Sequence, residues 1–249
     1  MTVLAVLCIN VDKLPWQNAL DADLEKKFGR TLPRRRELRV FASRILGWYE
    51  DRGRKYPWRK SRFPIYQVVI TEALLQRTRA DVVAKFLPEF LDQYPDWQAL
   101  HAARVSSLER SLEPIGLHKR RAKSLSSLAN EVIELGGRVP SDPLALFRLP
   151  GVGQYLFYAI NLYRHDAPMP LLDAGMARVL ERHFGARNLA DIRYDPYLQQ
   201  LAHGVVAAGN SKRINWAILD IGALVCVKNR PRCDLCPVSS TCLFHASVD

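Results

Sequence analysis

Four of the five cysteines of this 249-residue chain fall within seventeen residues near its carboxyl end, as Cys226-x6-Cys233-x2-Cys236-x5-Cys242. Thiols this close together can share one metal centre, and both structural zinc and a [4Fe–4S] cluster are held by four thiolates. Structural zinc commonly uses two C-x2-C pairs, and only Cys233 and Cys236 form such a pair. The thiols alone leave zinc and iron open. Two disulfides are disfavoured, because the fifth cysteine, Cys8, makes the number odd.

Two carboxylates lie in settings that suit opposite kinds of chemistry. Glu72 is surrounded by apolar residues in the helical pattern Val68–Leu75. It is either an exposed residue of an amphipathic helix or a carboxyl in an apolar pocket, where a raised pKa lets it deliver a proton. Asp173 precedes the helical pattern 176–183 and is expected to be its N-cap. Backbone N–H groups favour a charged carboxylate at that position, so we expect Asp173 to stay ionised near neutral pH.

The segment Leu149-Pro150-Gly151-Val152-Gly153 is a turn with glycines one residue apart. Such a turn lets a phosphate approach bare backbone N–H groups at a helix N-terminus, although an ordinary helix–helix turn is the alternative. We expect helices on both sides, at about 143–148 and 154–163. Asp142 followed by Pro143 provides the cap and first turn of the earlier one.

The elements that must position these residues are helices. Apolar residues follow i, i+3, i+4 spacing nearly throughout, as in Val68–Leu75 and Leu125–Leu135, and strict alternation is rare. Several prolines fall between the periodic segments, where helices are expected to end. The sequence therefore predicts an all-α protein, and its length suits one large domain or two modest ones.

The charge balance favours a polyanionic partner. Lys+Arg exceeds Asp+Glu, 36 to 25, which gives a net charge of +11 and a pI of about 9.6. Such an excess is typical of nucleic-acid binding, although simple solubility charge is the alternative. Basic residues cluster in four segments, Arg34–Arg36, Arg52–Arg62, His118–Lys123 and Lys228–Arg232. No stretch reaches the length of a membrane span, and the apolar opening Val3–Ile9 lacks the basic residues of a signal peptide. We expect a cytoplasmic protein.

Together, the cysteine spacing, the glycine turn and an aspartate eighteen residues after Tyr155 resemble the helix–hairpin–helix/Gly-Pro-Asp DNA glycosylases, the superfamily of endonuclease III and MutY. The resemblance runs from about Trp48 to Cys242. It implies a [4Fe–4S] cluster on Cys226, Cys233, Cys236 and Cys242. It also implies the two-domain endonuclease III fold, with a helical barrel at 60–166 and a second domain built from 1–59 and 167–249. Glu72 and Asp173 would lie on opposite walls of a DNA cleft.

The same resemblance assigns roles to single residues. The segment Thr71–Thr78 is similar to the T/S-E-x-x-L-x-x-T segment of monofunctional mismatch glycosylases, in which the glutamate protonates the departing base. Glu72 would be that acid, and Asp173 would stabilise the positive sugar. Tyr155 stands where bifunctional relatives carry a lysine, and a phenol cannot form a Schiff base. DNA contacts are expected from Gln76, Arg77 and Thr78, which would fill the gap left by a flipped nucleotide, and from Leu149, Gly151, Gly153, Gln154, Lys228, Arg230 and Arg232.

The substrate prediction depends on a few positions. Gly116-Leu117 and Arg121-Ala122 give the G-L-x-x-x-R-A form of the short thymine–DNA mismatch glycosylases, without the tyrosine pair of the adenine enzymes. Asp173-Ala174 fits that branch, whereas Gly175 replaces the usual asparagine of both. The chain ends seven residues after Cys242, so no domain for reading the opposite base is expected.

We therefore predict a monomeric, monofunctional DNA glycosylase that removes thymine or uracil opposite guanine from duplex DNA. The first alternative is a MutY-type enzyme that removes adenine opposite guanine or 8-oxoguanine. The second is a non-enzymatic iron–sulfur DNA-binding protein that senses redox state. The joint presence of Glu72 and Asp173 argues against this second alternative, because a protein that only binds DNA needs neither carboxylate.

Overall fold

The structure is a computed structural model that describes residues 14–60 and 63–247. The apolar segment Val3–Ile9, Cys8 and Arg62 lie outside the described residues. Within the described ranges the regular structure is helical and no residue lies in a strand, which confirms the all-α prediction. None of the described helices is both long enough and apolar enough to cross a membrane.

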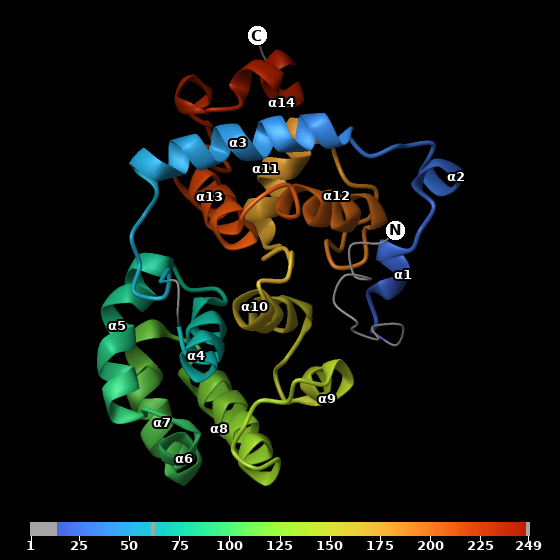
Figure 1. The fold of residues 1–249 in the computed structure, drawn as a ribbon. Helices are drawn as coiled ribbons and strands as arrows, with labels where there is room; N and C mark the ends of the chain where they lie inside the picture. The colour runs from blue at the N-terminus through green and yellow to red at the C-terminus, as the bar shows by residue number, and fades with distance from the viewer. Residues whose placement is uncertain (1–13, 61–62, 248–249) are drawn as a thin grey trace. The chain divides into compact units, whose positions relative to one another are not determined.

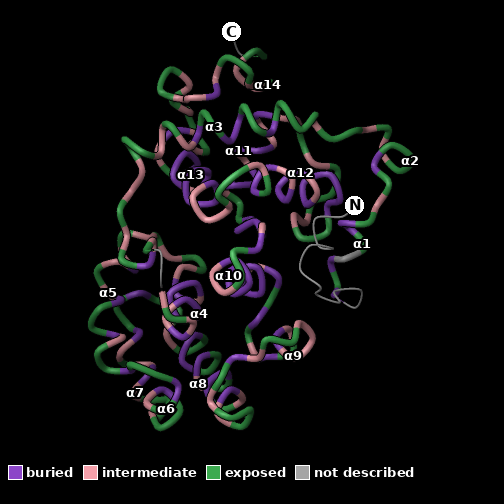
Figure 2. Tube along the Cα trace, viewed as in Figure 1, coloured by how far each residue is buried: buried purple, intermediate pink, exposed green. Residues whose placement is uncertain are grey.

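Contacts between Cα atoms divide the chain into two compact units. The continuous unit is Lys55–Arg164, and the discontinuous unit joins the chain up to Arg54 with the chain from His165 onward. The sequence prediction had placed the two boundaries at residues 60 and 166. Each unit has its own helices and its own buried residues (Figures 1 and 2).

The continuous unit is a group of short and medium-length helices, in which three pairs of helices pack closely. Helix α8 packs against α6 and α7, and α4 packs against α5. Residues such as Ile70, Leu100 and Leu128 are buried in this unit, where Figure 2 shows purple segments on the corresponding helices. The helices are α4 Ile65–Leu75, α5 Ala80–Gln93, α6 Trp97–Ala102, α7 Val105–Leu112, η2 Glu113–Ile115, α8 His118–Glu134, α9 Pro143–Arg148 and α10 Gln154–His165.

The discontinuous unit is built around α3 and α13, which pack against each other. Helix α12 also packs on α3, and α11 packs on α13, so that Ile45, Leu180, Leu201 and Ile218 share one buried core. Its helices are α1 Gln17–Leu20, α2 Leu24–Phe28, α3 Arg35–Arg52, α11 Ala174–Phe184, α12 Pro196–Val206, α13 Ser211–Leu224, η3 Cys233–Leu235, η4 Ser239–Thr241 and α14 Leu243–Ala246.

The helices predicted on either side of the glycine turn are present in the structure. The Asp142 side chain accepts a hydrogen bond from the backbone N–H of Ala145 at 2.8 Å, and Pro143 occupies the first turn of α9. After the turn, α10 begins at Gln154 as predicted and extends to His165. The two helices therefore flank the turn that the sequence indicated.

Candidate active site and nucleic-acid interface

Glu72 and Tyr155 meet inside the continuous unit. Glu72 lies on α4 with only 3% of its surface exposed, among the buried residues Val68, Val69 and Ile70. The Tyr155 hydroxyl, from the first turn of α10, donates a hydrogen bond to Glu72 Oε2 at 3.0 Å. The alternative in which Glu72 is an exposed residue of an amphipathic helix is therefore wrong. The structure supplies a buried carboxyl paired with a phenol, an arrangement that can hold a proton at a defined atom.

Asp173 is the N-cap of α11, as predicted. Its Oδ1 accepts a hydrogen bond from the backbone N–H of Met176 at 2.7 Å. Crowding by surrounding protein atoms nevertheless raises the pKa of the Asp173 carboxyl, and the backbone N–H groups and the nearby Arg178 only partly oppose that rise. The Asp173 pKa is therefore raised overall, whereas the hydrogen bonds of the N-cap alone would lower it. Asp173 also stays exposed to solvent, which limits the rise because water still reaches the carboxylate.

The buried Asn215 on α13 holds the segment that leads into Asp173. Asn215 Oδ1 accepts a hydrogen bond from the Leu171 backbone N–H at 2.6 Å, and its Nδ2 donates to the Met169 carbonyl at 3.0 Å. Nδ2 also donates to the Ser211 carbonyl within its own helix. Asn215 thus positions the approach to the candidate catalytic aspartate. Sequence reasoning missed this residue, because a lone asparagine in a helix carries no signal of a partner 44 residues away.

Gly175 leaves room around the Asp173 carboxylate. A Cβ at this position would lie 3.1 Å from Asp173 Oδ1, closer than ordinary van der Waals contact. On α13, a Cβ at Gly222 would likewise lie 3.2 Å from the Gly175 carbonyl oxygen. Gly175 therefore adds no side-chain atom next to the Asp173 carboxylate, and the missing Cβ of Gly222 lets α13 lie close to the first turn of α11.

The glycine turn is anchored by its apolar residues and exposes its glycines. Leu149 and Val152 are buried, whereas Gly151 and Gly153 are exposed. Gly151 has φ +79°, a left-handed conformation that favours glycine, and a Cβ there would meet Ser124 Oγ at 2.7 Å. The side chain of Gln154 is buried and donates to the Tyr158 hydroxyl at 3.4 Å. Only the backbone of Gln154 is therefore available for the predicted contact to DNA.

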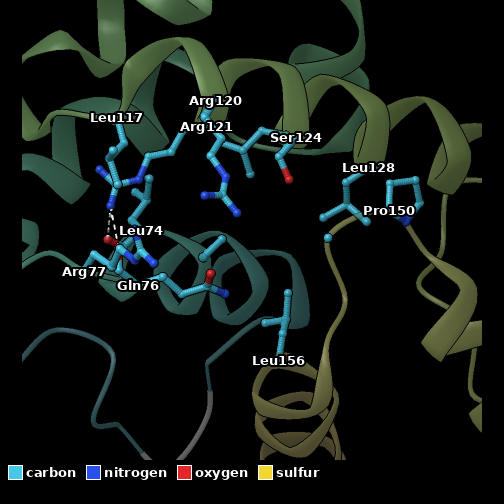
Figure 3. Close-up of a pocket in the computed structure, with 13 residues that line it drawn as sticks. Leu74, Gln76, Arg77, Leu117, Arg120, Arg121, Ser124, Leu128, Pro150 and Leu156 are labelled. Atoms are coloured by element: carbon cyan, nitrogen blue, oxygen red, sulfur yellow. Dashed lines mark hydrogen bonds between the residues drawn. The ribbon is translucent and has the colours of Figure 1, made fainter. Parts of the chain in front are cut away.

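A second exposed turn follows the end of α4. Gln76 and Arg77 are exposed, and Arg77 adopts φ +62°. Figure 3 shows these side chains beside Leu117 and Arg120 at a cavity of about 180 Å³. The cavity is polar and basic on this side, which suits a ligand with acceptor oxygens.

The four cysteines gather around one small cavity in the discontinuous unit, and no disulfide joins any two of them. Cys242 Sγ contacts the Arg182 carbonyl at 3.3 Å, and an Arg182 N–H donates to Cys226 Sγ at 3.4 Å. Burial, together with the three neighbouring thiols, raises the pKa of the Cys236 thiol to about 11. Among the described residues, no three His, Cys, Asp or Glu side chains are spaced to hold a single metal ion. The four thiols therefore line one cavity as free cysteines, which contradicts the alternative of two disulfides.

Two arginines of α11 anchor the loop between Cys226 and Cys233. Arg178 Nε donates to the Cys226 carbonyl at 2.8 Å, and Arg182 donates to the carbonyls of Val227 and Lys228 at 2.8 and 2.9 Å. The basic residues predicted to contact DNA are exposed on this loop, and they are Lys228, Arg230 and Arg232. Sequence reasoning did not identify the two anchoring arginines, which lie within an otherwise ordinary amphipathic helix.

The chain matches the family model of the HhH-GPD superfamily base excision DNA repair proteins over residues 70–204, more than half of its length. It is 34% identical over 209 residues to the thymine/uracil-DNA glycosylase of Methanothermobacter thermautotrophicus, covering 83% of this chain and 94% of that one. It is 33% identical to the thymine-DNA glycosylase of Aeropyrum pernix, covering 81% and 92%. The chain belongs to the HhH-GPD superfamily of base excision DNA repair proteins.

Solved structures agree with this assignment. A thermostable thymine-DNA glycosylase superposes with a TM-score of 0.78 at 33% identity, covering 85% of this chain and 98% of that one. A trapped endonuclease III–DNA covalent intermediate gives a TM-score of 0.73 at 18% identity, covering 87% and 99%, which shows the shared fold. The endonuclease III-like fold predicted from the sequence is confirmed.

Proposed function

We propose that this protein is a monofunctional DNA glycosylase that removes thymine or uracil opposite guanine from duplex DNA. The observation that carries the proposal is the hydrogen bond from Tyr155 to the buried Glu72. It places a phenol, which cannot form a Schiff base, beside a carboxyl in a family of base excision repair proteins. The thymine/uracil-DNA glycosylases to which the chain is similar act, by name, on the same two bases.

In the proposed reaction, the bond between the sugar C1′ and the pyrimidine nitrogen breaks and water adds to C1′. Glu72 supplies a proton to the departing base, which leaves neutral. Asp173 stabilises the positive charge that develops on the sugar, and one proton of the attacking water is released. A mispaired pyrimidine costs less to flip out of the duplex than a paired base does. The expected product is an intact strand with an abasic site.

The four thiols that line one cavity, Cys226, Cys233, Cys236 and Cys242, suit a [4Fe–4S] cluster. An Arg182 N–H lies within hydrogen-bond distance of Cys226 Sγ, so it could donate to that sulfur when it serves as a cluster ligand. When bound, the cluster would cross-link the loop and hold Lys228, Arg230 and Arg232 in place to contact phosphates. In this proposal its contribution is structural order, and the excision chemistry is left to the carboxylates.

The second candidate is adenine removal, because adenine DNA glycosylases are also similar to the chain. The enzyme of Rattus norvegicus is 30% identical over 222 residues, but this chain spans only 43% of that protein. The two candidates differ in the base released, so one set of substrates separates them.

The test is to incubate the purified protein with end-labelled duplexes that contain G·T, G·U, A·G or A·8-oxoguanine, with and without alkali afterwards. We expect strand breaks at T and U only, and only after alkali. Preferential release of adenine would transfer the assignment to the second candidate. Strong covalent trapping with borohydride would refute the monofunctional mechanism, and DNA binding without any abasic product would favour the redox-sensing alternative.

A further inference from the structure

Arg121 makes five hydrogen bonds from a buried position on α8, where 7% of its surface is exposed. All five acceptors are neutral oxygens, and no carboxylate pairs with Arg121 in the part of the chain that the structure describes. Nη1 donates to the carbonyls of Ile115 and Gly116 at 2.9 and 2.8 Å, and Nη2 donates to the carbonyls of Leu74 and Gln76 at 3.1 and 2.7 Å and to Thr78 Oγ1 at 2.7 Å.

Three of these acceptors, Gln76, Thr78 and Gly116, lie in two separate turns, and the other two, Leu74 and Ile115, lie one or two residues before them. One is the α4 turn, Gln76–Thr78, which follows the C-terminus of α4. The other is the α8 turn, Gly116–Leu117, which precedes α8. Each contains a non-glycine residue with positive φ, Arg77 at 62° and Leu117 at 53°, a conformation that costs on the order of 1 kcal/mol per residue. Such a conformation persists only where the surroundings hold it, and Arg121 donates hydrogen bonds to both turns. Figure 3 draws its hydrogen bonds on the α4 side, to Leu74 and Gln76.

Arginine suits this position better than lysine does. Its planar guanidinium has five N–H donors in a fixed geometry, whereas a lysine ammonium has three donors around one nitrogen and cannot satisfy all five acceptors from that single point. Burial lowers the pKa of Arg121, because removing the guanidinium from water destabilises its charged form. The positive charge also lies at the C-terminus of α4, where the helix dipole favours a cation.

Both turns expose side chains that are free to reach a ligand. Gln76 and Arg77 are exposed, and Leu117 shows 48% of its surface although it is a large apolar residue. The two turns line the same cavity. Two flexible turns would each lose conformational entropy on binding, whereas two turns tied to one guanidinium have lost it already.

We infer that Arg121 is a positioning residue that joins the α4 turn and the α8 turn into one rigid element, which occupies the gap left in the duplex when the target nucleotide is flipped out. This inference rests on the proposed function. It adds a residue that acts through Gln76, Arg77 and Leu117 and does not itself touch the reacting atoms. Loss of Arg121 should therefore impair the flipped state more than it impairs overall DNA binding.

The experiment compares Arg121→Lys with Arg164→Lys on a G·U duplex that carries 2-aminopurine next to the uracil. Arg164 is the matched control, because it lies in the same unit and its guanidinium also donates to two backbone carbonyls, those of Val139 and Pro140, away from both turns. The measurements are the fluorescence rise on flipping, the single-turnover excision rate, the dissociation constant for DNA and the melting temperature.

We expect Arg121→Lys to lose the fluorescence rise and to lower the excision rate by about 10²-fold, the effect of misplacing a binding group by about 1 Å. Arg164→Lys should lower the melting temperature but keep the fluorescence rise. A milder variant, Thr78→Val, removes one acceptor without changing charge and should give an intermediate loss of flipping. It decides the question if Arg121→Lys does not fold.

A normal fluorescence rise in a folded Arg121→Lys protein, or in Thr78→Val where Arg121→Lys does not fold, would overturn the inference. An equal loss of flipping in Arg164→Lys would overturn it too, because the effect would then be one of general stability. A wild-type protein that cuts neither G·U nor G·T would instead refute the proposed function, and the same variants would then be compared on whichever duplex of the substrate set the wild type cuts.

Discussion

Removing one oxygen atom from Tyr155 tests how the buried carboxyl works. Tyr155→Phe keeps the ring and deletes only the hydroxyl that donates to Glu72 Oε2 at 3.0 Å. Glu72 becomes charged as it gives its proton to the departing base, and a hydrogen bond to a charged group contributes about 1.5–3 kcal/mol. If the reaction depends on that bond, the single-turnover rate should fall by a factor on the order of 10–10², since about 1.4 kcal/mol corresponds to tenfold.

The assay is single-turnover excision of uracil opposite guanine, with the abasic strand cleaved by alkali at each time point. Tyr158→Phe is the matched control, because Tyr158 lies on the same helix and its hydroxyl accepts a hydrogen bond from Gln154 at 3.4 Å. We expect the control to keep the wild-type rate to within about twofold, because it deletes a hydroxyl from the same helix but leaves the hydrogen bond from Tyr155 to Glu72 in place.

A double-mutant cycle separates action through Glu72 from an independent role. In a Glu72→Gln background, which should itself cost on the order of 10²–10⁴ in rate, adding Tyr155→Phe should cost little more. Equal losses in both backgrounds would refute the coupling between the two residues. A wild-type rate in Tyr155→Phe would refute the role of the hydrogen bond altogether.

Three further predictions follow from the site and the core. Asp173→Asn should abolish excision while DNA affinity in a gel-shift assay stays equal or rises. Its melting temperature at pH 7 should not fall, because asparagine also caps helices and the raised pKa means that folding disfavours the ionised carboxylate. Burial lowers the pKa of His183 and His203 from 6.5 to about 4, so urea unfolding should show stability that is complete above pH 6.5 and lost as pH falls toward 4. Each histidine accounts for up to about 3 kcal/mol, and His203→Gln should reduce the dependence. Cys236→Ser should remove the broad visible absorption of a cluster and lower the soluble yield, whereas a colourless wild-type protein with bound zinc would refute the iron–sulfur proposal.

The sequence was sufficient for features whose partners lie within one or two helical turns. The cap at Asp142 and the cap at Asp173 each need only an N–H group three residues further on, so residue type and spacing predict them. The turn at Gly151 requires a glycine for its own backbone conformation. Helical periodicity is also local, and it gave the all-α class correctly.

The site itself is formed by contacts between residues far apart in the chain, and no local pattern encodes them. Tyr155 reaches Glu72 across 83 residues, and Arg121 reaches Leu74 across 47. Whether Glu72 was buried or exposed depended on which face of α4 packs inward. The direction of the Asp173 pKa shift depended on how closely surrounding atoms crowd the carboxyl. The sequence by itself therefore determined the residue types and the helices that carry them, whereas packing of the helices decided which side chains meet, because burial and long-range hydrogen bonds exist only once the chain is folded.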